Sequence, residues 1–271
     1  MYENAFNKIE RELRNEEGVA NELDYVEQTS WVLFLRYLHD LESERRDRAE
    51  LEGSDYTPIM EGEFRWDKWA APKLGGEFDH NLARIGDDLI KFVDQDLFPY
   101  LAAFRQYKVG EVFTELRNKF RSGYILRDVL EAVDGLSFNT QAQRHELSEL
   151  YETRIRRMGN AGRNGGEYYT PRPLIRAMIR VTAPKIGETI YDGAVGSAGF
   201  LCEAYDYMRT DQLSASQFET LQTKTFYGQE KKGLAYIIGI MNMVLHGIEA
   251  PNLIHSNTFS LSVLEWVKFD E

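Results

Sequence analysis

The chain has 271 residues, a formal net charge of −12 and a hydrophobic share of 43%. That share is enough to bury a core and excludes an intrinsically disordered chain. The negative charge argues against a free-standing DNA-binding protein, because phosphate contacts need lysine and arginine. A single cysteine, Cys202, excludes an internal disulfide and a cysteine-rich zinc site. The sequence has no apolar run of membrane length and no signal-peptide core, so we expect a cytoplasmic protein with no membrane partner.

The first half of the chain has apolar side chains at the three- and four-residue spacing of amphipathic helices. The pattern predicts helices at Phe6–Leu13, Trp31–Leu41, Asn81–Phe98 (ending before Pro99), two between Val109 and Val133, and one at Thr140–Met158. The run from Glu42 to Glu50 mixes charges at helical spacing, which predicts a solvated helix face. Prolines and glycines interrupt the pattern between Gly53 and Gly76. We expect the tryptophans of that loop to pack onto the helices rather than stack on a base.

The glycine- and asparagine-rich segment 159–166 is the clearest change in composition along the chain. It predicts a linker between a helical N-terminal domain, 1–158, and a second domain, 167–271. In the second domain, predicted helices and strands alternate as helix Arg172–Ala183, strand Thr189–Tyr191, helix Gly199–Arg209, strand Lys224–Gly228, helix Lys231–His246 and strand Asn252–His255. This order predicts right-handed crossovers and a parallel sheet. Because residues 267–271 resemble the approach to a fourth strand, we expect the sheet to continue in a longer protein.

Basic residues are concentrated between Arg154 and Lys185, where a single acid, Glu167, accompanies them. They are Arg154, Arg156, Arg157, Arg163, Arg172, Arg176, Arg180 and Lys185. One interpretation is a solvated face that neighbouring acids balance. The other is a surface that faces nucleic acid or an acidic partner.

The turn from Asp192 to Gly199 reads DGAVGSAG and follows a predicted strand. Its glycines are three residues apart, so it lacks the first step of the G-x-G-x-x-G dinucleotide fingerprint. Small residues still let a ligand approach the backbone, and the N-terminus of the following helix favours a negative group. The acid that ends the strand suits a positive amine better than a pyrophosphate. A plain strand-to-helix turn remains the alternative.

The next two predicted strands also end in polar residues. Glu230 is placed either to accept hydrogen bonds from ribose hydroxyls or to cap the following helix. Asn257 is placed either to bond a base edge or to form a turn. Three consecutive strand ends that carry such residues predict a ligand site at the carboxyl edge of the sheet.

Two segments in order resemble the modification (M) subunit of type I restriction-modification systems. They are the turn Glu167-Tyr168-Tyr169-Thr170-Pro171 and the loop from Asp192 to Phe200. That family of N6-adenine DNA methyltransferases has a G-[QE]-[FY]-[FY]-T-P turn before a D-P-A-C-G-T-G-G-F loop. The strand ends at Glu230 and Asn257 resemble its next two motifs, and the helical half resembles its N-terminal domain. The resemblance implies an α-helical N-terminal domain followed by an α/β Rossmann-like S-adenosylmethionine-dependent methyltransferase domain, incomplete at the C-terminus.

The resemblance also implies a site for the cofactor S-adenosylmethionine. Its residues are Glu167, Tyr168, Tyr169, Thr170, Pro171, Asp192, Gly193, Gly196, Ser197, Ala198, Gly199, Phe200, Glu230 and Asn257. By this likeness the tyrosine turn contacts the methionine part and the glycine turn lies beside its amine and carboxylate. Glu230 then holds the ribose, and Asn257 lies near the adenine. The chain departs from the family pattern mainly by small-for-small changes in the turn and by asparagine at 257, where the family has aspartate.

The family's catalytic motif, Asn-Pro-Pro-Phe/Tyr, does not occur in these 271 residues. Such a motif holds a flipped adenine by its amino group. We expect it beyond Glu271, and therefore expect the full-length protein to be an adenine-specific DNA methyltransferase and these residues alone to be inactive. The resemblance implies a specificity (S) subunit, a restriction (R) subunit and double-stranded DNA as partners. The alternatives are a nucleotide-binding oxidoreductase and a non-catalytic assembly module with a decayed cofactor site.

Overall fold

The computed structural model describes residues 2–104, 108–138, 140–160, 170–210, 212–248 and 251–260. The chain divides into two compact units, Met1–Gln143 and Arg144–Glu271. The division falls at the start of helix α8 (Gln141–Asn160), and most of the predicted linker lies outside the described residues. The predicted domain boundary therefore stays a prediction. Across the part of the chain that is described, no helix has the length and apolar character needed to cross a membrane.

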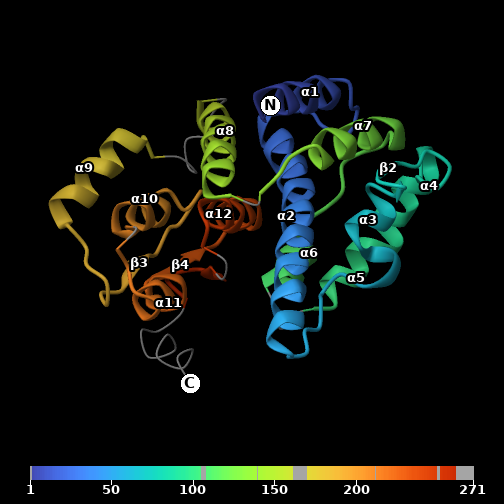
Figure 1. The fold of residues 1–271 in the computed structure, drawn as a ribbon. Helices are drawn as coiled ribbons and strands as arrows, with labels where there is room; N and C mark the ends of the chain where they lie inside the picture. Colours follow the sequence, from blue (N-terminus) through green and yellow to red (C-terminus); the bar gives the residue numbers. More distant parts are fainter. Residues whose placement is uncertain are drawn as a thin grey trace. The chain divides into compact units, whose positions relative to one another are not determined.

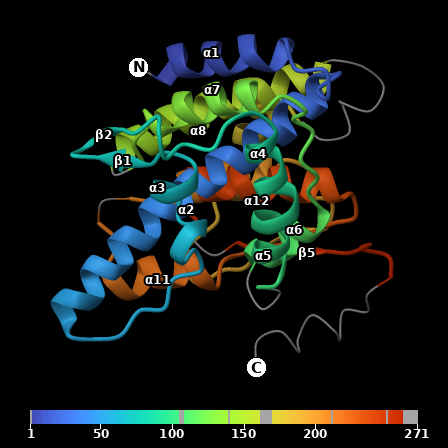
Figure 2. The same cartoon turned by 90° about the vertical axis from the view of Figure 1, so that its right-hand side faces the viewer.

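The N-terminal unit is helical around one long central helix, α2. Its elements are α1 (Tyr2–Arg14), α2 (Glu22–Glu52), η1 (Gly62–Phe64), α3 (Trp66–Trp69), β1 (Lys73–Leu74), β2 (Glu77–Phe78), α4 (Gly86–Lys91), the π-helical turn η2 (Phe92–Leu97), α5 (Phe98–Ala102), α6 (Lys108–Glu115) and α7 (Gly123–Asp134). The side chain of Asn21 caps the start of α2, and Gly53 ends it in the left-handed conformation at φ 68°. Helices α1 and α7 lie side by side and both contact α2 (Figure 2). The predicted helices of this half are confirmed in type, and most of their apolar side chains are buried.

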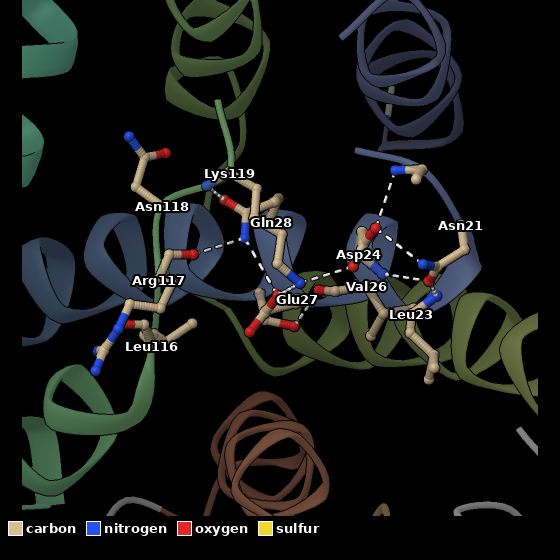
Figure 3. A network of polar contacts seen from close by, with 12 residues as sticks. Asn21, Leu23, Asp24, Val26, Glu27, Gln28, Leu116, Arg117, Asn118 and Lys119 are labelled. Carbon is tan, nitrogen blue, oxygen red and sulfur yellow. Dashed lines mark hydrogen bonds and ion pairs between the residues drawn. The ribbon is translucent and has the colours of Figure 1, made fainter. Parts of the chain in front are cut away.

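A polar network fixes the segment between α6 and α7 to the start of α2 (Figure 3). The amide of Gln28 donates to the Arg117 carbonyl at 3.0 Å, while its oxygen accepts the Lys119 backbone N–H at 3.0 Å and the indole N–H of Trp31 at 2.9 Å. The Lys119 ammonium pairs with Asp24 at 2.6 Å. Because Gln28 is fully buried, these bonds satisfy a side chain that would otherwise destabilise the core.

Three details of the predicted N-terminal half are wrong. Glu42 is 3% exposed rather than solvated, because its carboxylate accepts the backbone N–H groups of Ile59 and Met60. The helix predicted from Asn81 begins only at Gly86, so Leu82 lies exposed in the preceding turn. The predicted stop before Pro99 does not occur, because the helical path widens into the π-helical turn just ahead of the proline, which occupies the first turn of α5. Trp66 and Trp69 are buried, as predicted.

The C-terminal unit contains a three-stranded parallel sheet in the order β3-β4-β5. Its elements after α8 are α9 (Arg172–Thr182), β3 (Ile190–Asp192), α10 (Gly199–Met208), α11 (Ala215–Thr223), β4 (Phe226–Glu230), α12 (Gly233–His246) and β5 (Asn252–His255). Helices α10 and α12 pack together and against the strands, and α9 packs on α10 (Figure 1). The predicted parallel alternation is confirmed, with β4 in the middle. The predicted fourth strand lies outside the described residues.

Helix α11 was not predicted from the sequence. It begins with a capping box in which the Ser214 hydroxyl accepts the Gln217 N–H and the Gln217 side chain accepts the Ser214 N–H. The Ser-x-x-Gln spacing was therefore the available signal. Only Leu221 of this helix is buried, so its sequence has no apolar periodicity from which the helix could be predicted.

Candidate cofactor site

Two carboxylates lie at the carboxyl ends of adjacent parallel strands. Asp192 ends β3 and Glu230 ends β4. One Asp192 oxygen accepts the Ala194 backbone N–H at 3.0 Å, and Glu230 Oε2 accepts the Gly196 backbone N–H at 3.0 Å. Both acids therefore hold the glycine turn from its two sides, at the edge where open parallel sheets bind ligands.

Glu230 has a second contact at the start of α12. Its Oε1 accepts the backbone N–H of Lys232, the N-cap residue, at 2.8 Å. The capping interpretation is thus confirmed by geometry, and the same side chain also reaches the glycine turn. Its contact with a ribose stays a prediction.

Burial and the neighbouring carboxylate both disfavour the charged form of Asp192. Burial raises the pKa of Asp192 above its ordinary value, and the negative charge of Glu230 raises it further. Among the described residues, no lysine or arginine forms an ion pair with either acid. A cation such as an amine would relieve both effects.

The glycine turn leads into a helix N-terminus that has no side-chain cap. Gly196 and Ala198 have positive φ angles of 54° and 59°, and Ala198, the N-cap of α10, has no side-chain acceptor. The first N–H groups of α10 therefore have no capping side chain as acceptor, and such a terminus favours an anionic group. Gly228 lies beneath the turn, where a Cβ atom would stand 2.2 Å from Val195 Cγ2.

The end of β5 also contacts the turn. The Thr258 hydroxyl donates to the carbonyl of Gly193. Asn257 forms a turn of its own, in which its side-chain oxygen accepts the Phe259 N–H at 3.2 Å and its carbonyl accepts the Ser260 N–H at 2.8 Å. The turn interpretation of Asn257 is confirmed by geometry, and its place near an adenine stays a prediction. Thr258 is a contact that the sequence analysis missed.

A second missed feature links the three strands on the other face of the sheet. The Tyr191 hydroxyl donates to Gln229 Oε1 at 2.8 Å, and Gln229 Nε2 donates to the Ser256 hydroxyl at 2.7 Å. Alternating polar residues at consecutive strand ends were visible in the sequence, but their cross-strand partners depend on the register. This chain of bonds fixes the strand ends relative to one another.

The structure describes only part of the predicted tyrosine turn. Glu167, Tyr168 and Tyr169 lie outside the described residues, whereas Thr170 is exposed and Pro171 is the N-cap of α9. The next residue, Arg172, donates to the carbonyl of Gly199 in the glycine turn. The described end of the tyrosine turn is therefore one residue from a direct contact with the glycine turn. The remaining predicted residues, Ser197 and Phe200, lie within that turn and in the first turn of α10, respectively.

Two arginines of the basic stretch from Arg154 to Lys185 form ion pairs with acids on other helices, as the interpretation of a face balanced by neighbouring acids expects. Arg172 pairs with Glu152 of α8, and Arg176 pairs with Glu203 of α10 at 2.9 Å. Arg163 lies outside the described residues. Within the described ranges, no group of three or more histidine, cysteine or acidic side chains is arranged to hold a metal ion.

Known protein families match both units of the chain. The sequence profile of the HsdM N-terminal domain matches residues 3–152, and that of the N-6 DNA Methylase family matches residues 142–270. The chain belongs to the methylase (M) subunits of type I restriction enzymes. The type I restriction enzyme EcoEI methylase subunit of Escherichia coli is 34% identical over 94% of this chain and 51% of its own length.

Two solved structures of this family are similar over nearly the whole chain. One is a modification subunit ascribed to a type I restriction enzyme of Vibrio vulnificus YJ016, with a TM-score of 0.79, 33% identity, and coverage of 97% of this chain and 57% of that chain. The other comes from a study of complex assembly in the type I R-M system, with a TM-score of 0.82, 34% identity, and coverage of 97% and 52%. The chain spans about half the length of the curated relatives it matches. These matches give no support to the oxidoreductase or assembly-module alternatives.

Proposed function

We propose that this M-subunit chain carries the S-adenosylmethionine site of an enzyme that transfers a methyl group to adenine N6 in DNA. The observation that carries the proposal is geometric: two carboxylates, Asp192 and Glu230, end adjacent parallel strands, and the glycine turn after Asp192 leads into the N-terminus of α10, which has no side-chain cap. An amino acid zwitterion has the complementary charges, an amine for the acids and a carboxylate for the helix N-terminus. A pyrophosphate has no amine and would meet two carboxylates.

Each part of the cofactor has a candidate partner. Asp192 accepts a hydrogen bond from the amine, the first N–H groups of α10 bind the carboxylate, and Glu230 accepts bonds from the ribose hydroxyls. We expect Asn257 to lie beside the adenine and the tyrosine turn beside the methionine part, as the resemblance to the family implies. The bound cofactor supplies an electrophilic methyl group on a sulfonium. The α/β part of the chain is then the first portion of a Rossmann-like methyltransferase domain.

The same proposal extends to partners. We infer that the whole protein assembles in the cytoplasm with a specificity subunit and a restriction subunit on double-stranded DNA. The chain's net charge of −12 supports dependence on a separate subunit for DNA recognition, since a solitary reader of DNA needs a basic surface. The 271 residues contain no Asn-Pro-Pro segment, so we expect them to bind the cofactor without transferring its methyl group.

Isothermal titration calorimetry tests the proposal. The chain is titrated with S-adenosylmethionine, with S-adenosylhomocysteine and with NAD under the same conditions. Saturable heat with the first two at one site per chain, and none with NAD, is the expected result. Binding of NAD in place of the methionine cofactors would contradict the assignment and favour the oxidoreductase alternative.

A further inference from the structure

A buried ionic cluster joins three helices behind the glycine turn. Glu152 of α8 accepts hydrogen bonds from Arg172 of α9, one of them from Nε at 2.9 Å. The same carboxylate accepts a bond from the amide of Asn242 of α12. Arg172 is 9% exposed and Asn242 is fully buried. Arg172 belongs to the basic stretch noted in the sequence, whereas no sequence pattern singled out Glu152 or Asn242.

The cluster donates to two carbonyls of the glycine turn. Arg172 Nη1 donates to the carbonyl of Gly199, and Asn242 Nδ2 donates to the carbonyl of Ser197 at 2.8 Å. Because a trans peptide is planar, with its N–H opposite its C=O, holding a carbonyl fixes the direction of the next N–H. The two held peptides, Ser197–Ala198 and Gly199–Phe200, flank the peptide that joins Ala198, the N-cap of α10 at φ 59°, to Gly199. The cluster therefore sets the direction of the backbone where α10 begins.

The contacts of this cluster are expected to contribute little net stability to the fold. A buried ion pair loses much of its attraction to desolvation and is weak evidence for stability. Asn242 donates its two amide hydrogens to Glu152 and to the Ser197 carbonyl, and these bonds fix the orientation of its side chain. Its buried Oδ1 then has no hydrogen-bond partner among the described residues. An unmet buried acceptor costs free energy. Both costs occur at the same place, directly behind the predicted ligand site.

We propose that Glu152, Arg172 and Asn242 form a clamp that presets the glycine turn for the amino-acid end of the cofactor. The three are positioning residues, since they act on the ligand only through the backbone of the turn. This inference rests on the proposed function, and it assigns the chain's affinity for the methionine part to residues that do not touch it.

The test uses four variants of the chain. Arg172→Gln removes the charge, Arg172→Lys keeps the charge with a single donor group, and Glu152→Gln weakens the acceptor. Arg176→Gln is the control for loss of a charge on the same helix. Arg176 lies one turn along α9 and bonds Glu203, a carboxylate that also lies 4.0 Å from Arg172 Nε, but no described bond of Arg176 reaches the glycine turn. Binding of S-adenosylhomocysteine and of methylthioadenosine, which lacks the amino-acid end, is measured by calorimetry. Amide hydrogen exchange of residues 195–200 is measured without ligand.

Arg172→Gln is expected to weaken S-adenosylhomocysteine binding about tenfold or more, consistent with the loss of a charged hydrogen bond. Methylthioadenosine binding is expected to change by less than about twofold, because the clamp does not reach the ribose or base. Exchange of the turn should rise in Arg172→Gln, rise less in Arg172→Lys and Glu152→Gln, and stay unchanged in Arg176→Gln.

Equal losses for the two ligands would overturn the proposal, since they indicate a general structural defect. Unchanged exchange of the turn in Arg172→Gln would also overturn it. If Arg172→Gln does not fold, Arg172→Lys and Glu152→Gln decide the question by the same two readouts. Should the unaltered chain bind no methionine cofactor, the proposed function fails, while the exchange measurement still decides whether the clamp holds the turn.

Discussion

Asp192 and Glu230 are carboxylates that the parallel register brings to one edge of the sheet. Their positions at strand ends were predictable from the sequence, because each follows a short apolar strand. Their shared contact with the glycine turn was not, because it depends on how the turn folds back over β4. Glu230 reaches the N–H of Gly196 from a strand 34 residues further along the chain. The local patterns thus located the acids, and the tertiary contacts define how they act together.

Replacing Asp192 tests the proposed amine contact. Asp192→Asn keeps the shape and an oxygen acceptor for the Ala194 N–H but removes the charge. We expect affinity for S-adenosylmethionine to fall about tenfold to a hundredfold, the usual range for a charged hydrogen bond. Calorimetry measures the effect, with the exposed Glu188→Gln in the preceding turn as the control. Equal affinity in Asp192→Asn and the unaltered chain would exclude the contact.

His246 makes the C-terminal unit sensitive to acid. Its side chain is nine-tenths buried, and its Nδ1 lies 2.8 Å from the Asn242 carbonyl. Burial, aided by the charge of Arg172, lowers the pKa of His246 to about 4, against some opposition from Glu203. A lowered pKa means that the neutral form stabilises the fold above the unfolded pKa, near 6.5. This stability is lost as the pH falls through about 4.

A pH series of urea unfolding experiments measures this effect as a difference between variants. From pH 7 to pH 4, the unaltered chain should lose about 3 kcal/mol of unfolding free energy relative to His246→Gln. The comparison is needed because burial raises the pKa of nearby Asp206 to about 6. The protonated form of Asp206 therefore stabilises the fold at low pH, and this contribution is lost as the pH rises through about 6. The Asp206 side chain is 42% exposed, so its opposing effect is the smaller one. Parallel pH profiles for His246→Gln and the unaltered chain would contradict the account.

Helices with a clear apolar stripe were predictable, and elements held by polar contacts were not. The residues of α1 and α2 that recur at helical spacing are buried, so their pattern reports the core directly. Helix α11 buries a single apolar side chain, and its start depends on a capping box. The helix through Pro99 continues because a π-helical turn removes the conflict with the proline, and no local preference encodes that solution.

Close packing of the glycine turn over β4 requires a glycine at position 228. A Cβ atom there would stand 2.2 Å from Val195 Cγ2 and 2.9 Å from a Leu253 methyl. We expect Gly228→Ala to lower the unfolding free energy of the C-terminal unit by about 1–3 kcal/mol, because a well-packed core must shift to admit the methyl group. Urea unfolding monitored by far-UV circular dichroism measures the change in unfolding free energy.

Gly135→Ala provides the matched control for this substitution. Gly135 has φ −68°, and an added Cβ would meet only ordinary contacts at 3.7 Å and beyond. The control should leave stability unchanged or raise it slightly. A Gly228→Ala variant as stable as Gly135→Ala would show that the turn does not rest on β4 as described.

Considered along its whole length, the chain combines a helical unit with a parallel α/β unit, and the change from helices alone to alternating strands and helices was visible in the sequence. The distribution of charge was less informative. The sequence left open whether the basic stretch from Arg154 to Lys185 is a face balanced by neighbouring acids or a surface for a partner, because counting along the chain does not identify ion-pair partners on other elements. Glu152 lies just before the stretch and Glu203 well after it, yet they pair with Arg172 and Arg176. The fold is therefore needed to decide which of these charges can face a partner.

The central claim is that the carboxyl edge of β3, β4 and β5 binds S-adenosylmethionine by its amino-acid end and ribose. A crystal structure of the chain with S-adenosylhomocysteine tests it most directly. The account predicts the amine beside Asp192, the carboxylate at the N-terminus of α10 and the ribose beside Glu230. A ligand bound elsewhere on the chain, or bound here with its adenine beside Asp192, would contradict the account.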